Sequence, residues 1–271
     1  MHIKYIAELC QNHLGNFKNI EKMVEECAYY GAKIIKLQYI LSKNLSHRPE
    51  FDLGINQNNK QIVIKRPYIT EYKRLKKLEL SDKEIKKFIK CCEKNRVEPA
   101  ITCFARENVV RLKELGFKTI KVASYDCGSY QLIRETSKNF KNIIISTGAT
   151  HDDEIKKTFD ILKKSKSNFS FLHCITLYPT LFKDLNLDRI NYLKKYSKNV
   201  GYSDHSSSKG KLRNLASMAA IFFGAKIIER HIRILDIHES KDGPVSIEPK
   251  DINEVINFSK LTKSDQKLFL K

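Results

Sequence analysis

Eight short apolar runs, separated by segments with helical spacing, constrain the fold of this 271-residue chain more than any other feature. Apolar residues three and four positions apart predict amphipathic helices, and every run except the second is followed promptly by such a segment. Strands that alternate with helices predict a parallel sheet, and eight of them predict a closed (β/α)₈ barrel, a TIM barrel, as one domain over 1–271. The runs cover residues 3–9, 33–38, 99–104, 118–124, 142–147, 169–175, 199–204 and 225–230.

A doubly wound open sheet is the alternative fold, but no GxGxxG sequence follows the first run, as the dinucleotide-binding version of that fold requires. Ser81 stands where the N-cap of a helix over 81–95 is expected. The polar stretch 41–80 is long for a loop of a barrel, and we expect it to fold over the mouth.

The composition favours a cytosolic protein with a small anionic ligand. The formal net charge is +19, but acidic residues are interleaved with the lysines along the helical segments, as on a solvated helix face. Nucleic acid is therefore not the expected partner. The seven cysteines form no CxxC pair, and several lie in apolar runs, so we predict reduced, buried thiols. The chain has no secretory signal and no apolar stretch that would span a membrane.

Polar side chains stand at the end of every apolar run, where the active sites of (β/α)₈ barrels lie. We therefore expect them to gather at one mouth. They are Glu8, Lys36, Gln38, Thr102, Lys121, Ser124, Ser146, Thr147, His173, Thr176, Ser203, Asp204, His205, Glu229 and His231.

Two lysines, Lys36 and Lys121, stand inside apolar runs, where burial of an unpaired ammonium group is unfavourable. Either they extend to the rim, or they hold an anion inside the mouth. In the second case nearby hydroxyl groups supply neutral donors. Such a site suits a small molecule that carries phosphate and carboxylate.

Two histidines, His205 and His231, follow the seventh and eighth runs. A single histidine in such a place is more often structural, but a pair on neighbouring strands favours a shared divalent cation, with Glu229 or Asp204 as outer support. Glu8 lies near the eighth strand once the barrel closes, which suits a base or a substrate anchor.

Motifs spread over residues 6–249 resemble the sialic acid synthase family, which includes N-acetylneuraminate, pseudaminate and legionaminate synthases. The motifs are "IAELCQNHLGN", "GAKIIKLQ", "IKVASYD", "IIISTGAT", "LHCITLYPT", "VGYSDHS" and "GAKIIERHI". The resemblance implies a (β/α)₈ barrel that condenses phosphoenolpyruvate with a sugar aldehyde and releases phosphate. The product would be a 2-keto-3-deoxy acid of the nonulosonic type, used for surface polysaccharides.

The resemblance also implies residue roles. Manganese, or else magnesium or cobalt, would be bound by His205 and His231. Gln38 would sit between the substrates, and Glu8 would orient or deprotonate the reacting water or a sugar hydroxyl. Phosphoenolpyruvate would be held by Lys36, Lys121, Thr102, Ser124, Ser146, Tyr178 and Ser203.

The chain departs from the family pattern on the sugar side. After "LTKSDQKLFLK" no antifreeze-like C-terminal domain follows, so a separate chain would complete the site or the substrate would lack the group which that domain binds. In the family this domain caps the barrel of the partner subunit in a dimer. Without it, a homodimer is less expected here. The aspartate of a GPD segment is absent, with Asp242 or Asp236 as substitutes, and Thr176 stands where some members have asparagine.

Two alternatives to the synthase interpretation stay open. One is a synthase for a phosphorylated sugar, with Lys65 and Arg66 serving the second phosphate. The other is a non-catalytic barrel that binds the ligand or a partner synthase.

Overall fold

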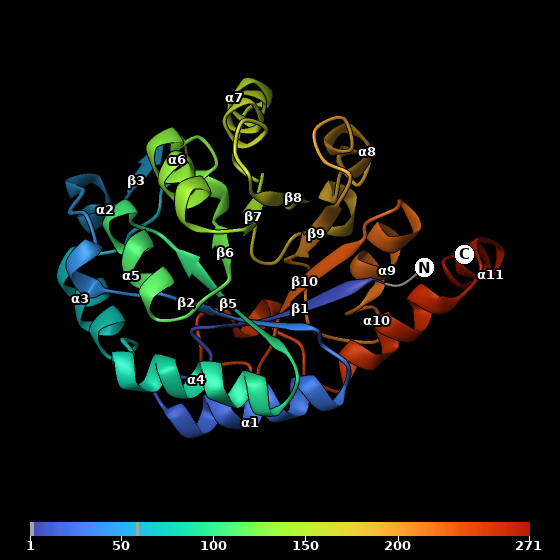
Figure 1. Ribbon diagram of the computed structural model, residues 1–271, viewed down its shortest axis with the longest axis horizontal. Helices are drawn as coiled ribbons and strands as arrows, with labels where there is room; N and C mark the ends of the chain where they lie inside the picture. The colour runs from blue at the N-terminus through green and yellow to red at the C-terminus, as the bar shows by residue number, and fades with distance from the viewer. Residues whose placement is uncertain (1–2, 58–59) are drawn as a thin grey trace.

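The computed structural model describes residues 3–57 and 60–271, and within them eight parallel strands close into a barrel (Figure 1). The barrel order is β1-β10-β9-β8-β7-β6-β5-β2, and β2 pairs with β1. The predicted (β/α)₈ barrel is confirmed, and the open-sheet alternative is wrong. The strands are β1 (Lys4–Cys10), β2 (Ile34–Gln38), β5 (Glu98–Cys103), β6 (Thr119–Val122), β7 (Asn142–Ser146), β8 (Asn168–His173), β9 (Val200–Asp204) and β10 (Ile227–His231).

Helices surround the strands on the outside of the barrel (Figure 1). They are α1 (Phe17–Tyr29), α4 (Asp82–Lys94), α5 (Val109–Glu114), α6 (Tyr130–Asn139), α7 (Asp152–Leu162), α8 (Arg189–Leu193), α9 (Leu215–Phe222), α10 (Asp251–Lys260) and α11 (Lys263–Phe269). The expectation of a prompt helix after the eighth strand is wrong. Residues 232–250 lie between β10 and α10 and contain the short 3₁₀ helix η5 (Gly243–Val245).

The start of α4 agrees with its sequence signal. Ser81 is the N-cap, and its hydroxyl accepts a hydrogen bond from the Glu84 N–H at 3.3 Å. The Glu84 carboxylate accepts one from the Ser81 N–H at 2.8 Å, which completes a capping box. Behind this cap the apolar face of α4 buries Ile85, Phe88 and Ile89 in the layer between strands and helices.

Alternation along the strands explains why polar side chains reach the barrel interior. Side chains two positions apart in a strand point to the same face. An apolar cluster of Ile6, Ile34, Ala100, Ile144, Leu172 and Ile227 fills the interior at the amino-terminal side. Two positions further along five of these strands stand Glu8, Lys36, Thr102, Ser146 and Glu229. The packed layer therefore forms the floor, and the next layer lines the mouth.

The long segment after β2 has structure of its own. It contains η1 (Ser42–Asn44), α2 (Pro49–Leu53), the antiparallel pair β3 (Ile55–Gln57) and β4 (Lys60–Val63), and α3 (Tyr68–Lys76). In agreement with the expected position at the mouth, Arg66 of this segment lines the central cavity.

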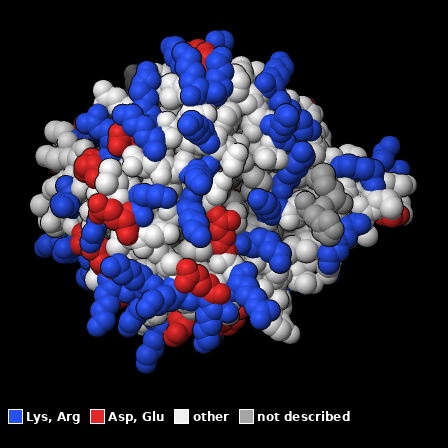
Figure 2. Space-filling model, viewed as in Figure 1, with Lys and Arg blue, Asp and Glu red and all other residues white. Residues whose placement is uncertain are grey.

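Basic side chains cover much of the face seen in Figure 2, with acidic side chains among them. In the part of the chain that the structure describes, no helix has the length and apolar character needed to cross a membrane.

Candidate active site

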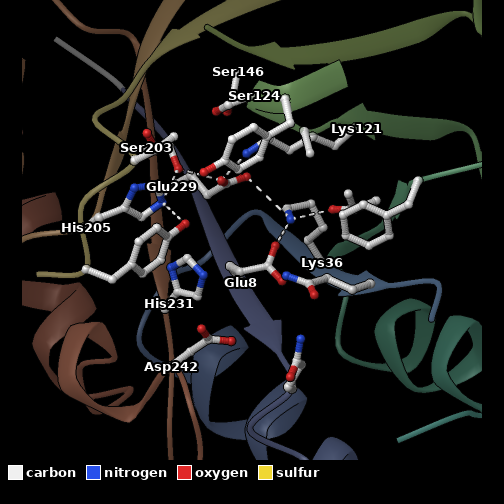
Figure 3. Close-up of a pocket in the computed structure, with 18 of the residues that line it drawn as sticks. Glu8, Lys36, Lys121, Ser124, Ser146, Ser203, His205, Glu229, His231 and Asp242 are labelled. Carbon is white, nitrogen blue, oxygen red and sulfur yellow. Dashed lines mark hydrogen bonds and ion pairs between the residues drawn. The ribbon is translucent and has the colours of Figure 1, made fainter. Parts of the chain in front are cut away.

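A cavity of about 310 Å³ opens at the carboxyl ends of the barrel strands (Figure 3), and all eleven predicted site residues line it. They are Glu8, Lys36, Gln38, Thr102, Lys121, Ser124, Ser146, Tyr178, Ser203, His205 and His231. The strands bring together side chains that are far apart in the sequence. Glu8 and His231, for example, are 223 residues apart and are paired across β1 and β10.

The two lysines are buried and paired with carboxylates. Lys36 forms an ion pair with Glu8 and donates to the Thr102 hydroxyl at 2.8 Å. Lys121 forms an ion pair with Glu229, which also lies 3.7 Å from Lys36 (Figure 3). Because both ammonium groups lie inside the cavity, the alternative in which they extend to the solvent rim is wrong.

These pairings control the charges of the buried groups. Burial lowers the pKa of Lys36 to about 7, with Lys121 acting in the same direction and Glu229 opposing it. The charge of Lys36 therefore depends on the carboxylates beside it. Burial alone would raise the pKa of Glu229, but Lys121 and Lys36 outweigh that effect and hold its pKa well below the usual range. Glu229 is thus an anion that keeps two cations in place.

Hydroxyl groups lie beside the lysines in the cavity. Ser203 donates to Glu229 at 2.7 Å, and the Ser124 hydroxyl lies 2.9 Å from the Cys174 sulfur. The Ser146 hydroxyl is buried and has no hydrogen-bond partner among the described residues. An unpaired buried hydroxyl is unfavourable, so Ser146 is a donor that lacks its acceptor.

His205 is held in one orientation by three contacts. Its Nδ1 lies 2.7 Å from the Ile175 carbonyl oxygen, which makes Nδ1 the protonated nitrogen. Nε2 then carries the lone pair, 3.1 Å from the Tyr178 hydroxyl, and the two rings stack with centroids 4.3 Å apart. Burial lowers the pKa of His205 to about 4, so the ring is neutral at physiological pH, as a metal ligand must be.

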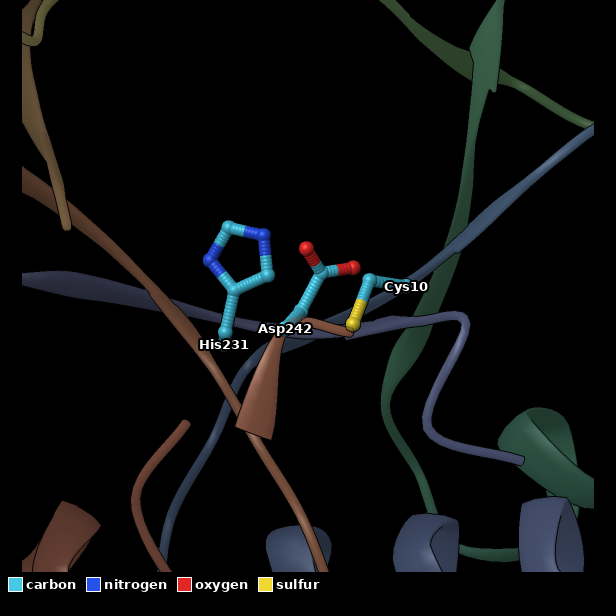
Figure 4. Close-up of side chains that lie close together, drawn as sticks. All are labelled: Cys10, His231 and Asp242. Carbon is cyan, nitrogen blue, oxygen red and sulfur yellow. The ribbon is translucent and has the colours of Figure 1, made fainter. Parts of the chain in front are cut away.

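The site fits a divalent cation. The ring centroids of His205 and His231 are 5.4 Å apart, and Nδ1 of the buried His231 has no hydrogen-bond partner among the described residues. Burial lowers the pKa of His231 well below its usual value. Cys10, His231 and Asp242 bring one ligand atom each within 4.8 Å of one another (Figure 4). Two neutral imidazoles beside a thiol and a carboxylate are a suitable donor set for a metal.

Three residues that we expected at the mouth do not line the central cavity. The Asp204 carboxylate pairs with Arg230 and accepts from Ser217 of α9 at 2.6 Å. His173 Nε2 lies 2.7 Å from the Leu185 carbonyl, and the Thr147 hydroxyl donates to the Leu172 carbonyl at 3.1 Å. Each directly follows an inward residue, so alternation turns it outward.

The Asp204–Arg230 pair still acts on the site through the chain. Arg230 is fully buried and donates to the Ser206 hydroxyl at 2.8 Å and to its carbonyl at 2.9 Å. Arg230 therefore contacts Asp204 and Ser206, the two residues that flank His205 in the sequence.

Sequence reasoning missed several residues of the cavity. The thiols are free and buried, as predicted, but nothing in the sequence indicated that Cys10 would lie beside the cavity residues His231 and Asp242. Of the two candidates for the missing aspartate, Asp242 lines the cavity and Asp236 is exposed. The positions of Asp236 and Asp242 depend on the path of the loop between β10 and η5. No periodic pattern in the sequence predicts that path. Gln11, Phe104, Ala123 and Tyr125 also line the cavity.

A closed barrel with a charged, hydroxyl-lined mouth defines an enzyme-like member of the (β/α)₈ class. A model of the NeuB family matches residues 23–266, and the chain belongs to that family. N,N'-diacetyllegionaminic acid synthase of Campylobacter jejuni is 31% identical over 255 residues, which are 91% of this chain and 72% of the relative. Pseudaminic acid synthase of the same species is 29% identical and covers 96% and 73%.

A solved structure supports the same assignment. The N-acetylneuraminic acid (sialic acid) synthetase of Leptospira borgpetersenii serovar Hardjo-bovis, in complex with citrate, superposes with a TM-score of 0.82 at 28% identity. The match covers 99% of this chain and 85% of that chain.

Proposed function

We propose that this chain condenses phosphoenolpyruvate with a sugar aldehyde to give a 2-keto-3-deoxy acid and phosphate. One observation carries the proposal. One cavity holds two buried lysines, each paired with a carboxylate. Beside them lie a serine hydroxyl and an imidazole nitrogen that have no hydrogen-bond partner in the described part of the chain. The relatives named as synthases of sugar acids support the same reaction class.

The charges of the cavity support an anionic substrate with a metal. Three cationic side chains and three carboxylates line it: Lys36, Lys121 and Arg66, and Glu8, Glu229 and Asp242. A multiply charged anion would find little net attraction in such a balanced cavity. A divalent cation supplies the missing positive charge, and manganese is the ion we propose to assay first. His205 and His231 would hold this ion, and it would polarise the aldehyde oxygen.

The chain's own residues would bind and orient both substrates. Lys36 and Lys121 would hold the carboxylate and phosphate of phosphoenolpyruvate, with Thr102, Ser124, Ser146, Tyr178 and Ser203 donating hydrogen bonds. Gln38 would lie between the two substrates. The positions are fixed before substrate arrives, because each lysine is already held by a carboxylate.

The bond changes follow from this arrangement. Carbon 3 of phosphoenolpyruvate forms a bond to the aldehyde carbon, the C=O double bond of the aldehyde opens, and its oxygen takes up a proton to become a hydroxyl. Water adds to carbon 2. Glu8, which pairs with Lys36, would accept the proton of that water and return it to the new hydroxyl oxygen. The bond between carbon 2 and the bridging oxygen then breaks, phosphate leaves, and a keto group remains.

A phosphorylated sugar is the second candidate acceptor, and one cluster favours it. Three cations surround the buried Glu71: Arg66 pairs with it, Arg74 donates to it at 2.8 Å, and Lys241 lies 3.7 Å away. Asp242 also lies near these three cations, so two carboxylates face three positive charges and the cluster keeps a net positive charge at the end of the cavity that Arg66 lines. A phosphate on the acceptor would be attracted to it.

Phosphate release from phosphoenolpyruvate with manganese tests the proposal across a panel of sugars. The panel contains N-acetylmannosamine, diacetamido-trideoxyhexoses, plain hexoses and arabinose 5-phosphate. We expect release with one acceptor, loss of release in His205→Ala, and normal release in His238→Ala, which removes an exposed histidine. Thermal stabilisation by phosphoenolpyruvate without release for any sugar would favour the non-catalytic barrel.

A further inference from the structure

The end of β1 places a cysteine where the backbone favours glycine. Cys10 has a φ of 42°, in the left-handed region that residues with a Cβ rarely adopt. The ladder between β1 and β2 shifts register between Glu8 and Cys10, and the Cys10 N–H donates to Glu8 Oε1 at 2.8 Å. A glycine would make the same backbone contacts without strain, so the side chain is the reason for a cysteine here.

The thiol points to two other metal-ligating groups. Cys10 Sγ, a His231 ring nitrogen and an Asp242 carboxylate oxygen all lie within 4.8 Å of one another (Figure 4). They come from β1, from β10 and from the loop before η5, so only the folded barrel brings them together. His231 is 5% exposed and its Nδ1 has no hydrogen-bond partner among the described residues.

This donor set differs in chemistry from a site made of imidazole and oxygen. Thiolate, imidazole and carboxylate together are typical of Zn²⁺ and other thiophilic divalent ions, whereas Mg²⁺ and Mn²⁺ prefer oxygen. A catalytic metal site also keeps one position open for a substrate atom, and the cavity beside this cluster would provide it. His231 and Asp242 line that cavity.

We propose that Cys10 and Asp242 bind the metal of this site together with the proposed ligands His205 and His231, and that the resulting sulfur–metal bond selects zinc over manganese. His205 neighbours the His231 imidazole, with ring centroids 5.4 Å apart. The use of this ion in catalysis rests on the proposed function, whereas its binding does not.

Cobalt binding to the metal-free full chain tests the sulfur ligand without any substrate. A cysteine thiolate bound to Co²⁺ gives a charge-transfer absorption band in the near ultraviolet. We expect this band in the wild-type protein and in Cys91→Ser, which changes another buried cysteine on α4. We expect it to disappear in Cys10→Ser and in Cys10→Gly, and the glycine variant relieves the left-handed backbone if the serine variant folds poorly.

Zinc affinity provides the second measurement. Loss of even an outer-shell partner typically reduces metal affinity 10–100-fold, so loss of a direct ligand in Cys10→Ser should weaken Zn²⁺ binding at least about tenfold. Manganese binding should change little. Cobalt binding without the band in the wild type, a band that persists in Cys10→Ser, or no cobalt binding at all would overturn the proposal. Phosphate release, measured separately, reports on the proposed function alone.

Discussion

Replacement of Glu229 by glutamine removes a negative charge from between two buried lysines and keeps the shape of the side chain. Glu229 is 2% exposed, pairs with Lys121, accepts from Ser203 at 2.7 Å and lies 3.7 Å from Lys36. Loss of one partner of a buried ion pair costs about 3–5 kcal/mol, because the other charge stays buried without compensation. At roughly 2–4 °C per kcal/mol, we expect Tm to fall by about 6–20 °C.

Phosphoenolpyruvate should partly reverse this loss, because its negative charge replaces that of the missing carboxylate beside the lysines. Thermal melts with and without the ligand should show a larger stabilisation of Glu229→Gln than of the wild type. Glu248→Gln is the matched control, since Glu248 pairs with Lys250 at 2.6 Å on the surface and such pairs contribute about 1 kcal/mol or less. A Tm of Glu229→Gln within about 2 °C of the wild type would refute the reasoning.

Three further predictions concern single side chains. Lys121→Met should weaken phosphoenolpyruvate binding about tenfold or more by calorimetry, because a hydrogen bond to a charged group is worth about 1.5–3 kcal/mol. Burial lowers the pKa of His13 from the usual 6.5 to about 4, so the unfolded chain binds a proton first as the pH falls. The free energy of unfolding should therefore fall by about 3 kcal/mol between pH 6.5 and 4 because of this group. Chemical denaturation at several pH values should show this loss in the wild type and not in His13→Asn. Ser81→Ala removes the N-cap of α4 and should cost about 1 kcal/mol in denaturant melts.

Each of these predictions has a contrary outcome. Unchanged affinity in a folded Lys121→Met protein would separate this lysine from the anion site. An acid loss of stability in His13→Asn equal to that of the wild type would assign the titration to other groups. A Ser81→Ala protein as stable as the wild type would mean that the capping box contributes nothing measurable.

The sequence was sufficient to predict the barrel and the side chains at its mouth. Apolar runs with period-two alternation identify which residues share the interior face, as with Ile6 and Glu8 in β1. The same rule predicts that Asp204 and His173 point outward, because each directly follows an inward residue. The expectation that they line the mouth was wrong because it placed every polar residue near a strand end on the inward face.

The positions of Cys10 and Asp242 were not available from such a rule. A register shift and a left-handed residue turn the end of β1, and the loop after β10 has no repeat that fixes its path. Pairing between segments more than 200 residues apart brings them to His231. Tertiary geometry of this kind appears only in the folded barrel.

The most direct test of the proposed reaction uses phosphoenolpyruvate with heavy oxygen at the bridge between carbon 2 and phosphorus. The protein is incubated with manganese or zinc and the acceptor sugar, and the products are weighed by mass spectrometry. The account predicts an acid heavier than the acceptor by the mass of pyruvic acid, with the heavy oxygen in the released phosphate. Phosphate without the label, or phosphate without a new acid, would contradict it.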